Sequence, residues 1–179
     1  MRFDYYYYKN VYTPDECKEI AEFAKNNTSE HWVDNGAAGK KVKTTQIETS
    51  IIQSKLKRFF DFVYEGNDVC FGFSLYPNLP RSIHLNTYSG QQNEYPFHKD
   101  GYPNGSASDL KLTAILNLSL EPYEGGEFHV FDGNITRLEY IDTVGSLLII
   151  PSHTFHRVTP VTKGERITLS CWFAGPNWK

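Results

Sequence analysis

Residues 164–173 read GERITLSCWF and decide the class of fold, because from Arg166 to Phe173 every second side chain is apolar. The apolar set is Ile167, Leu169, Cys171 and Phe173, and the other set is Arg166, Thr168, Ser170 and Trp172. Successive side chains of an extended chain point to opposite faces of a sheet. The stretch therefore predicts a strand with one apolar face and one face that carries a charge.

Arg166 is the unusual residue of this strand. If the strand is internal, the guanidinium needs an anionic partner, since a buried unpaired charge is very costly. A dicarboxylate ligand would supply that partner. The plainer alternative is a surface strand with a solvated arginine, and without further signals this alternative is the better one.

The same period of two residues extends over most of the chain. It starts at Val69, where every second residue up to Leu75 is apolar, and it continues over 83–88. Further predicted strands are 111–120, 127–131, 146–150 and 166–173, with turn residues at 125–126, 132–134 and 163–164 between them. The run from Tyr5 to Tyr8 predicts an edge strand with two rings buried.

Two helices are predicted before most of these strands. Residues 13–17, TPDEC, combine an N-cap threonine, a proline at the first helical position and a capping glutamate, which predicts a helix over about 14–25. A second amphipathic pattern over 52–63 ends at Gly66-Asn67. Helices followed by strands predict an α+β, mainly β fold, a sandwich or barrel backed by helices.

Length and charge narrow the class of protein. The 179 residues match one compact unit, so we predict a single domain over 1–179. A net charge of −3 gives no broad basic field, and nucleic acid is not an expected partner. No stretch resembles a signal peptide or a bilayer span, and three widely spaced cysteines do not form a disulfide framework. We therefore expect a cytoplasmic protein without a membrane partner.

Residues 98–100, HKD, contain the only H-x-D among the six histidines. In an extended chain, residues two apart share a face and lie roughly 6.6 Å apart, so His98 and Asp100 can converge on one metal ion. His156 is the candidate third ligand, and two histidines with one carboxylate leave open positions suited to non-haem iron(II). An isolated H-x-D is common by chance, so the assignment depends on His156 and on Arg166 ten residues later.

These motifs, in this order, resemble the prolyl-4-hydroxylase-type branch of the 2-oxoglutarate/Fe(II)-dependent oxygenases. The likeness rests on HKD at 98–100, GGEF at 125–128, HRVTPV at 156–161 and Arg166, and it covers the chain from about Tyr88 to Trp172. It implies a double-stranded β-helix, a jelly-roll or cupin-like fold of antiparallel strands in two sheets. The N-terminal helices are then expected to pack on the larger sheet.

The resemblance also implies roles for single residues. His98, Asp100 and His156 match the iron ligands, and Arg166 matches the residue that pairs with the distal carboxylate of 2-oxoglutarate. Tyr88 matches a tyrosine that hydrogen-bonds the cosubstrate, although a core aromatic is an equally good interpretation.

Other matches concern the walls of the pocket. Asn117 and Ser170 stand where relatives place residues near the cosubstrate, and Trp172 where an aromatic side chain lines the pocket. His84, on the same predicted strand face as Tyr88, is a further candidate for the lining. Animal collagen-type members carry lysine in the place of Arg166, so the likeness leaves the peptide substrate open.

The implied activity is that of a dioxygenase, an oxidoreductase that uses Fe(II), 2-oxoglutarate and O2 and releases succinate and CO2, with ascorbate as a candidate reductant. A prolyl residue in a peptide or protein is the leading substrate. Two alternatives stay open: a hydroxylase of a free amino acid or another small molecule, and a catalytically silent barrel that binds a metal or ligand. The glycine-rich segments 34–41 and 101–109 are expected to be mobile loops that form a lid, or else ordinary solvated loops.

Overall fold

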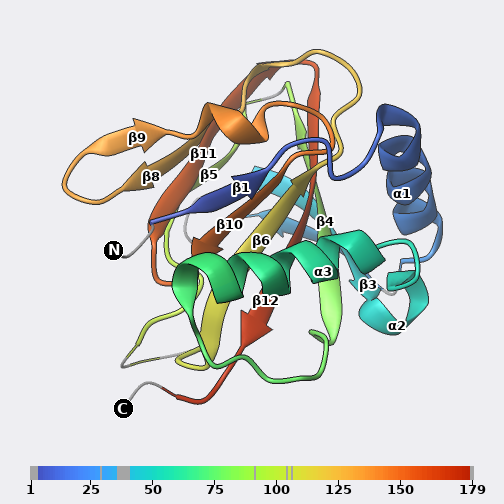
Figure 1. The fold of residues 1–179 in the computed structure, drawn as a ribbon. Helices are drawn as coiled ribbons and strands as arrows, with labels where there is room; N and C mark the ends of the chain where they lie inside the picture. Colours follow the sequence, from blue (N-terminus) through green and yellow to red (C-terminus); the bar gives the residue numbers. More distant parts are fainter. Residues whose placement is uncertain are drawn as a thin grey trace.

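The computed structural model describes residues 4–28, 30–35, 41–90, 92–103, 105 and 107–177. Two antiparallel sheets form the centre of the fold (Figure 1). The larger sheet contains, in spatial order, β1 (Tyr6–Tyr8), β10 (Leu147–Pro151), β6 (Leu110–Asn117), β12 (Glu165–Ala174), β4 (Ser82–Ser89), β3 (Lys41–Glu48) and β2 (Glu30–Asn35). The smaller sheet contains β5 (Asn93–His98), β11 (Phe155–Lys163), β8 (Phe128–Phe131) and β9 (Ile135–Arg137), with β7 (Glu124–Gly125) paired to β11.

The helices cover one face of the larger sheet, as predicted (Figure 1). Helix α1 (Pro14–Asn26) begins with the expected capping box, because the Thr13 hydroxyl accepts from the Glu16 amide and the Glu16 carboxylate accepts from the Thr13 amide. Buried side chains of the helices and the sheet form one apolar cluster, which includes Cys17, Ile20, Ile52, Phe59, Val63, Leu85, Leu116, Ile149 and Leu169. This cluster packs the helices against one face of the larger sheet. The other face of the sheet contacts a second apolar cluster and lines a cavity.

The second predicted helix is divided in the structure. It consists of α2 (Thr49–Ile52) and α3 (Lys57–Gly66), and a turn between them keeps Leu56 in the core. The α-helix ends at Gly66, as predicted, but a π-helical turn, η2 (Asn67–Phe71), follows directly and ends at Gly72 with φ of 66°. The apolar spacing thus identified the buried face and the end of the helix, and it missed the break at 53–56 and the π-helical turn.

The strand predicted from Val69 to Leu75 is also wrong. Its first residues belong to η2, and residues 72–81 form neither helix nor strand. The Asn67 side chain explains the difference, since its amide donates to the Phe73 carbonyl at 2.9 Å and its oxygen accepts from the Phe73 amide at 3.0 Å. A side chain has taken the backbone groups that a strand partner would need.

The segment 34–41, predicted as a loop, belongs in part to a hairpin. Asp34 and Asn35 end β2 and pair with Val42 and Lys41 of β3, while residues 36–40 lie outside the described residues. The described part of the second glycine-rich segment, 101–109, contains turns and no regular strand or helix, as expected. The lid function stays a prediction.

Strands β5 and β11, which carry the candidate ligands His98 and His156, were not predicted as strands. Each contains a proline, Pro96 in β5 and Pro160 in β11, and proline counts against a central strand because it lacks the backbone N–H. The pairing of the two strands has register shifts between His156 and Val158 and between Val158 and Val161. An irregular ladder of this kind leaves a weak sequence pattern.

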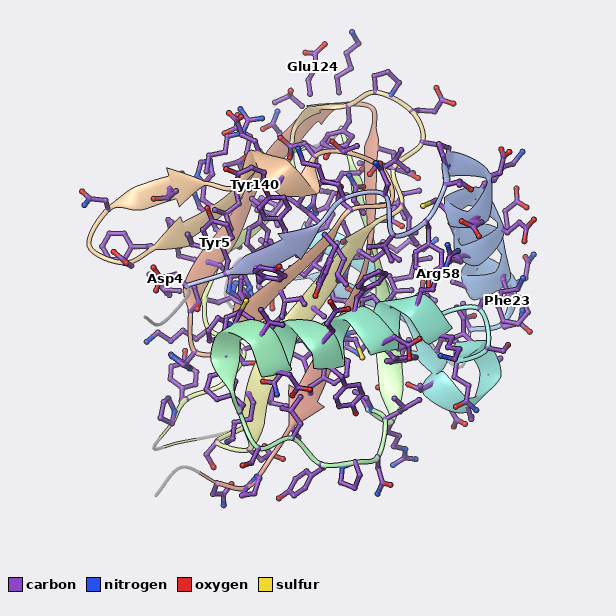
Figure 2. The ribbon with its side chains drawn as sticks, viewed as in Figure 1. Asp4, Tyr5, Phe23, Arg58, Glu124 and Tyr140 are labelled. Atoms are coloured by element: carbon purple, nitrogen blue, oxygen red, sulfur yellow. The ribbon has the colours of Figure 1, made fainter. Side chains whose placement is uncertain are left out.

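The tyrosine run forms the edge strand β1, as predicted, but the expected pair of buried rings is wrong, because Tyr5 to Tyr8 are all half-buried. The side chains of the strand alternate between two faces. Tyr8 packs on Phe62 of α3 with tilted rings 4.5 Å apart, whereas Tyr7 stacks on Tyr140 of the short helix η3 (Glu139–Ile141) at 3.9 Å. Tyr5 lies beside the same Tyr140 ring (Figure 2). In the described part of the chain, no helix has the length and apolar character needed to cross a membrane.

Candidate metal centre and cosubstrate pocket

Three side chains that the sequence singled out meet at one end of the smaller sheet. His98 ends β5 and is directly opposite His156, the second residue of β11, in the strand register. Asp100 lies two residues beyond β5, and its amide and that of Gly101 both donate to the Ser152 carbonyl at 3.0 Å. A turn, rather than a continuous strand, therefore brings the carboxylate to the two imidazoles.

The distances suit a single metal ion. His98 Nε2 lies 3.3 Å from Asp100 Oδ1, and His156 Nε2 lies 3.7 Å from Asp100 Oδ2. All three ligand atoms lie within 4.8 Å of one another. In an octahedral site with bonds of about 2.1 Å, neighbouring ligand atoms are about 3 Å apart, so the group needs little adjustment to bind an ion.

Both imidazoles are oriented by contacts on their far sides. Nδ1 of His98 lies 2.9 Å from the Pro96 carbonyl, and Nδ1 of His156 lies 2.9 Å from the Thr154 carbonyl. A carbonyl only accepts, so Nδ1 carries the proton in each ring and Nε2 keeps its lone pair for a metal. Tyr95 stacks on the His98 ring at 3.7 Å, which fixes the plane of that ring.

Burial and charge set the protonation states of the group. Burial would raise the pKa of Asp100, but the contacts that its carboxylate makes with His98 and His156 in their protonated forms, and with the Thr113 hydroxyl, lower it well below its usual range. Burial lowers the pKa of His156, although Asp100 partly opposes the shift. An ionised carboxylate and a neutral imidazole are the forms that bind a metal ion.

Arg166 lies in the same cavity and is 1 % exposed. Its Nε and Nη2 atoms have no hydrogen-bond partner among the described residues, and its guanidinium lies 5.3 Å from the centre of the Tyr88 ring. A buried guanidinium with unused donors is costly unless an anion completes it. A carboxylate group would supply the missing acceptors, because its two oxygens match the planar fork of donors that arginine presents.

Two neighbours define the surroundings of Arg166. Gly126, with φ of 65°, lies so close that an added Cβ would be 2.9 Å from Arg166 Cδ, so the glycine makes room for the arginine stem. Tyr88 is fully enclosed, and burial raises the pKa of its phenol to about 12 even though Arg166 acts in the opposite direction. The phenol is therefore neutral and able to donate a hydrogen bond to an anion.

The cavity has a volume of about 190 Å³ and is lined by both sheets. Of the residues predicted from the sequence, it brings together His84, Tyr88, His98, Asp100, His156, Arg166, Ser170 and Trp172. The larger sheet gives a polar wall, in which Thr44 donates to Asn86 at 2.9 Å and Asn86 donates to Ser170 at 3.1 Å. Phe128 and Val158 of the smaller sheet form an apolar wall on the other side.

Asn117 is the one predicted site residue that does not line the cavity. Its amide donates to the carbonyls of Ile141 and Asp142 at 2.8 and 3.1 Å, and its oxygen accepts from the Ser119 amide at 2.9 Å. Its side-chain polar atoms are thus used at the end of η3 and just after β6. The geometry corrects the prediction: Asn117 links β6 to η3 and does not line the cavity.

Other cavity residues were not singled out from the sequence. Thr113 donates to Asp100 Oδ2 at 2.7 Å, and Phe128 stacks on His156 at 5.4 Å. A signal for Thr113 existed, because the predicted strand 111–120 places it on one face with Ile115, which also lines the cavity. The pattern gave no means of telling which of these residues would lie beside the metal ligands.

Known proteins resemble the chain in both sequence and fold. Residues 83–174 match the model of the 2OG-Fe(II) oxygenase superfamily. The PKHD-type hydroxylase YbiX of Escherichia coli O6:K15:H31 is 30% identical over 180 residues, which cover 93% of this chain and 76% of YbiX. A Pseudomonas putida prolyl-4-hydroxylase has a TM-score of 0.75 at 19% identity, with 97% of this chain and 93% of that chain covered.

A second solved structure is a viral collagen prolyl hydroxylase of Paramecium Bursaria Chlorella virus-1 in a 2OG complex. Its TM-score is 0.74 at 16% identity, with 97% of both chains covered. These likenesses confirm the predicted double-stranded β-helix with helices on its larger sheet.

Proposed function

Because the chain belongs to the 2OG-Fe(II) oxygenase superfamily, we propose that it hydroxylates a prolyl residue of a peptide or protein and binds its iron through His98, Asp100 and His156. The family uses Fe(II), 2-oxoglutarate and O2, and the chain is accordingly a 2-oxoglutarate-dependent dioxygenase. The names of its relatives support the choice of substrate, since they are a PKHD-type hydroxylase and prolyl hydroxylases.

One observation carries the assignment of the site: a buried arginine with unused donors lies in the same cavity as the three ligand side chains. The triad by itself would suit several metal ions. Arg166 adds a requirement for an anion, which a dicarboxylate cosubstrate meets by reaching from the metal to the guanidinium. The combination favours an oxygenase over a barrel that only stores a metal.

The bound iron and 2-oxoglutarate supply the oxidative chemistry that inserts an oxygen atom from O2 into a substrate C–H bond. The residues of the chain bind and orient the iron and the 2-oxoglutarate. Asp100 and His156 would offer an ionised and a neutral ligand, Arg166 would pair with the distal carboxylate, and the neutral Tyr88 phenol would be able to donate to the same anion. Phe128 and Val158 exclude water from one side of the cavity.

The test is an assay of succinate formation and oxygen uptake with a panel of proline-containing peptides, followed by mass spectrometry. We expect succinate and a peptide that has gained one oxygen atom, and no gain in matched peptides that carry alanine in place of proline. Turnover with free amino acids alone would point to a small-molecule hydroxylase, and metal binding without turnover to a silent barrel. The roles of ascorbate as reductant and of the cytoplasm as location stay predictions.

A further inference from the structure

A chain of two buried hydroxyl groups ends on the candidate ligand Asp100. Thr113 Oγ1 lies 2.7 Å from Asp100 Oδ2 and 3.0 Å from Ser152 Oγ. Thr113 is 2 % exposed and Ser152 is 0 % exposed, so water does not compete for these contacts. The hydroxyls therefore have a fixed set of partners.

Proton counting sets the direction of this chain. An ionised carboxylate only accepts, so the single hydroxyl proton of Thr113 is donated to Asp100. The contact of Thr113 with Ser152 must then use the proton of Ser152, and the order is Ser152 to Thr113 to Asp100.

The backbone of the same serine holds the backbone of the same aspartate. The Ser152 carbonyl accepts from the amides of Asp100 and Gly101 at 3.0 Å each, and the Ser152 amide donates to the Lys111 carbonyl at 2.9 Å. Asp100 is outside β5, so no strand ladder fixes it. Its position comes instead from Ser152 and Thr113.

Thr113 itself is anchored in the middle of the larger sheet. In the strand register it pairs with Ile150 of β10 on one side and with Trp172 of β12 on the other. Thr113 is therefore held firmly in the larger sheet, and its hydroxyl contacts Asp100, which follows β5 of the smaller sheet.

We infer that Thr113 is a positioning residue of the metal centre, whose hydroxyl, oriented by Ser152, holds Asp100 Oδ2 so that Oδ1 is the oxygen presented to the metal. Oδ1 is the oxygen on the His98 side, 3.3 Å from Nε2. A carboxylate held by one oxygen binds through the other, which keeps a coordination position open for the cosubstrate and oxygen. This inference rests on the proposed ligation of the metal by Asp100.

The experiment titrates the metal-free protein with Co(II), and it records both the affinity and the visible absorption of the bound ion. Thr113→Val keeps the shape of the side chain and removes the hydroxyl, and we expect roughly 10- to 100-fold weaker binding and an altered spectrum. Thr113→Ser restores the hydroxyl and should return both values close to wild type. Ser152→Ala should have a smaller effect, and the double variant should match Thr113→Val because the two residues act in series.

The control is Thr45→Val, which removes the hydroxyl of a buried threonine on β3 that does not line the cavity. It should leave Co(II) binding unchanged. If Thr113 has only a structural role, Thr113→Val should also bind Co(II) like wild type. A Co(II) affinity and an absorption spectrum of Thr113→Val that equal those of wild type would therefore overturn the inference. If Thr113→Val does not reach the wild-type circular dichroism, Ser152→Ala decides, and unchanged binding in that variant overturns the proposed order.

A failure of the proposed function is recognised separately in the same titration. If His98→Ala binds Co(II) as tightly as wild type, the ligand set itself is wrong, whatever Thr113 does. If His98→Ala loses the metal and Thr113→Val does not, the ligand set stands and only the positioning role is lost.

Discussion

The two sheets build the cavity in different ways. The larger sheet is regular around the cavity, with β12 and β4 in unbroken register from Glu165 opposite Ser89 to Ser170 opposite His84. The smaller sheet pairs β11 with β5 through two register shifts, and the metal ligands lie at the irregular end. The regular sheet holds Arg166 at a fixed position in the cavity wall. The irregular sheet allows His98, His156 and the segment that carries Asp100 to come together. The anchor and the metal group should therefore respond independently to mutation.

Removing a ligand from the smaller sheet should have the largest effect. We expect His98→Ala and His156→Ala to weaken Fe(II) binding by more than roughly 100-fold. This exceeds the loss expected when a residue that only hydrogen-bonds to a metal ligand is removed. His153→Ala is the control, since this histidine lies three residues before His156 and is not part of the metal group. Calorimetric titration under anaerobic conditions gives the comparison, and wild-type affinity in both variants would remove the assignment.

The next largest effect should come from the anchor on the larger sheet. Arg166→Ala loses a charged hydrogen-bonded pair worth about 1.5–3 kcal/mol, which is roughly a 10- to 150-fold rise in the dissociation constant for 2-oxoglutarate. Arg166→Lys should recover only part of the affinity for 2-oxoglutarate, since lysine offers a point charge in place of a planar fork of donors. Arg157→Ala is the control, because this arginine donates to His129 at 3.1 Å and does not line the cavity. Equal 2-oxoglutarate binding in Arg166→Ala and Arg157→Ala would place the anchor elsewhere.

A smaller effect on the same wall should follow from Gly126→Ala. Both Gly126 and Gly133 have positive φ, of 65° and 89°, so alanine at either position should cost about 1–2 kcal/mol of folding stability. Only at Gly126 does the added methyl group meet Arg166, while nothing lies within 4 Å at Gly133. Gly126→Ala should therefore also raise the dissociation constant for 2-oxoglutarate, and Gly133→Ala should not. Identical cosubstrate binding in the two variants would show that Gly126 serves the turn alone.

The smallest effect concerns pH. His156 has a folded-state pKa below its ordinary value of 6.5, because burial disfavours the charged form. The unfolded chain then binds more protons, so the free energy of unfolding of the metal-free protein should fall as pH drops below about 6.5 and level off below the folded pKa. The slope from this residue is at most about 1.4 kcal/mol per pH unit. Denaturant unfolding of wild type and His156→Gln measures it, and equal slopes would contradict a neutral buried His156.

The contrast between the sheets also explains what the sequence could predict. On β12 an unbroken alternation runs through a buried strand, so Arg166, Ser170 and Trp172 were placed on one face correctly. On β5 and β11, Pro96 and Pro160 and the register shifts blur the period, and the ligands were found by residue type and resemblance.

The errors have local causes. Asn117 was assigned to the cavity by resemblance alone, whereas its side-chain contacts lie at the end of β6 and at η3. The Asn67 side chain replaces a strand ladder at Phe73, a contact between residues six apart that no two-residue period reveals. The pairing of β2 with β3 was hidden by the polar, glycine-rich sequence that links the two strands.

The central claim is that the two sheets together form one site, with the metal bound by the smaller sheet and the cosubstrate anchored by the larger one. The most direct measurement is an anaerobic calorimetric titration of 2-oxoglutarate into three samples: the Fe(II)-loaded wild type, the metal-free wild type and Fe(II)-loaded Arg166→Ala. We predict tight binding in the first and much weaker binding in both others, with the Fe(II) affinity of Arg166→Ala unchanged. Equal 2-oxoglutarate binding in all three samples would contradict a shared site.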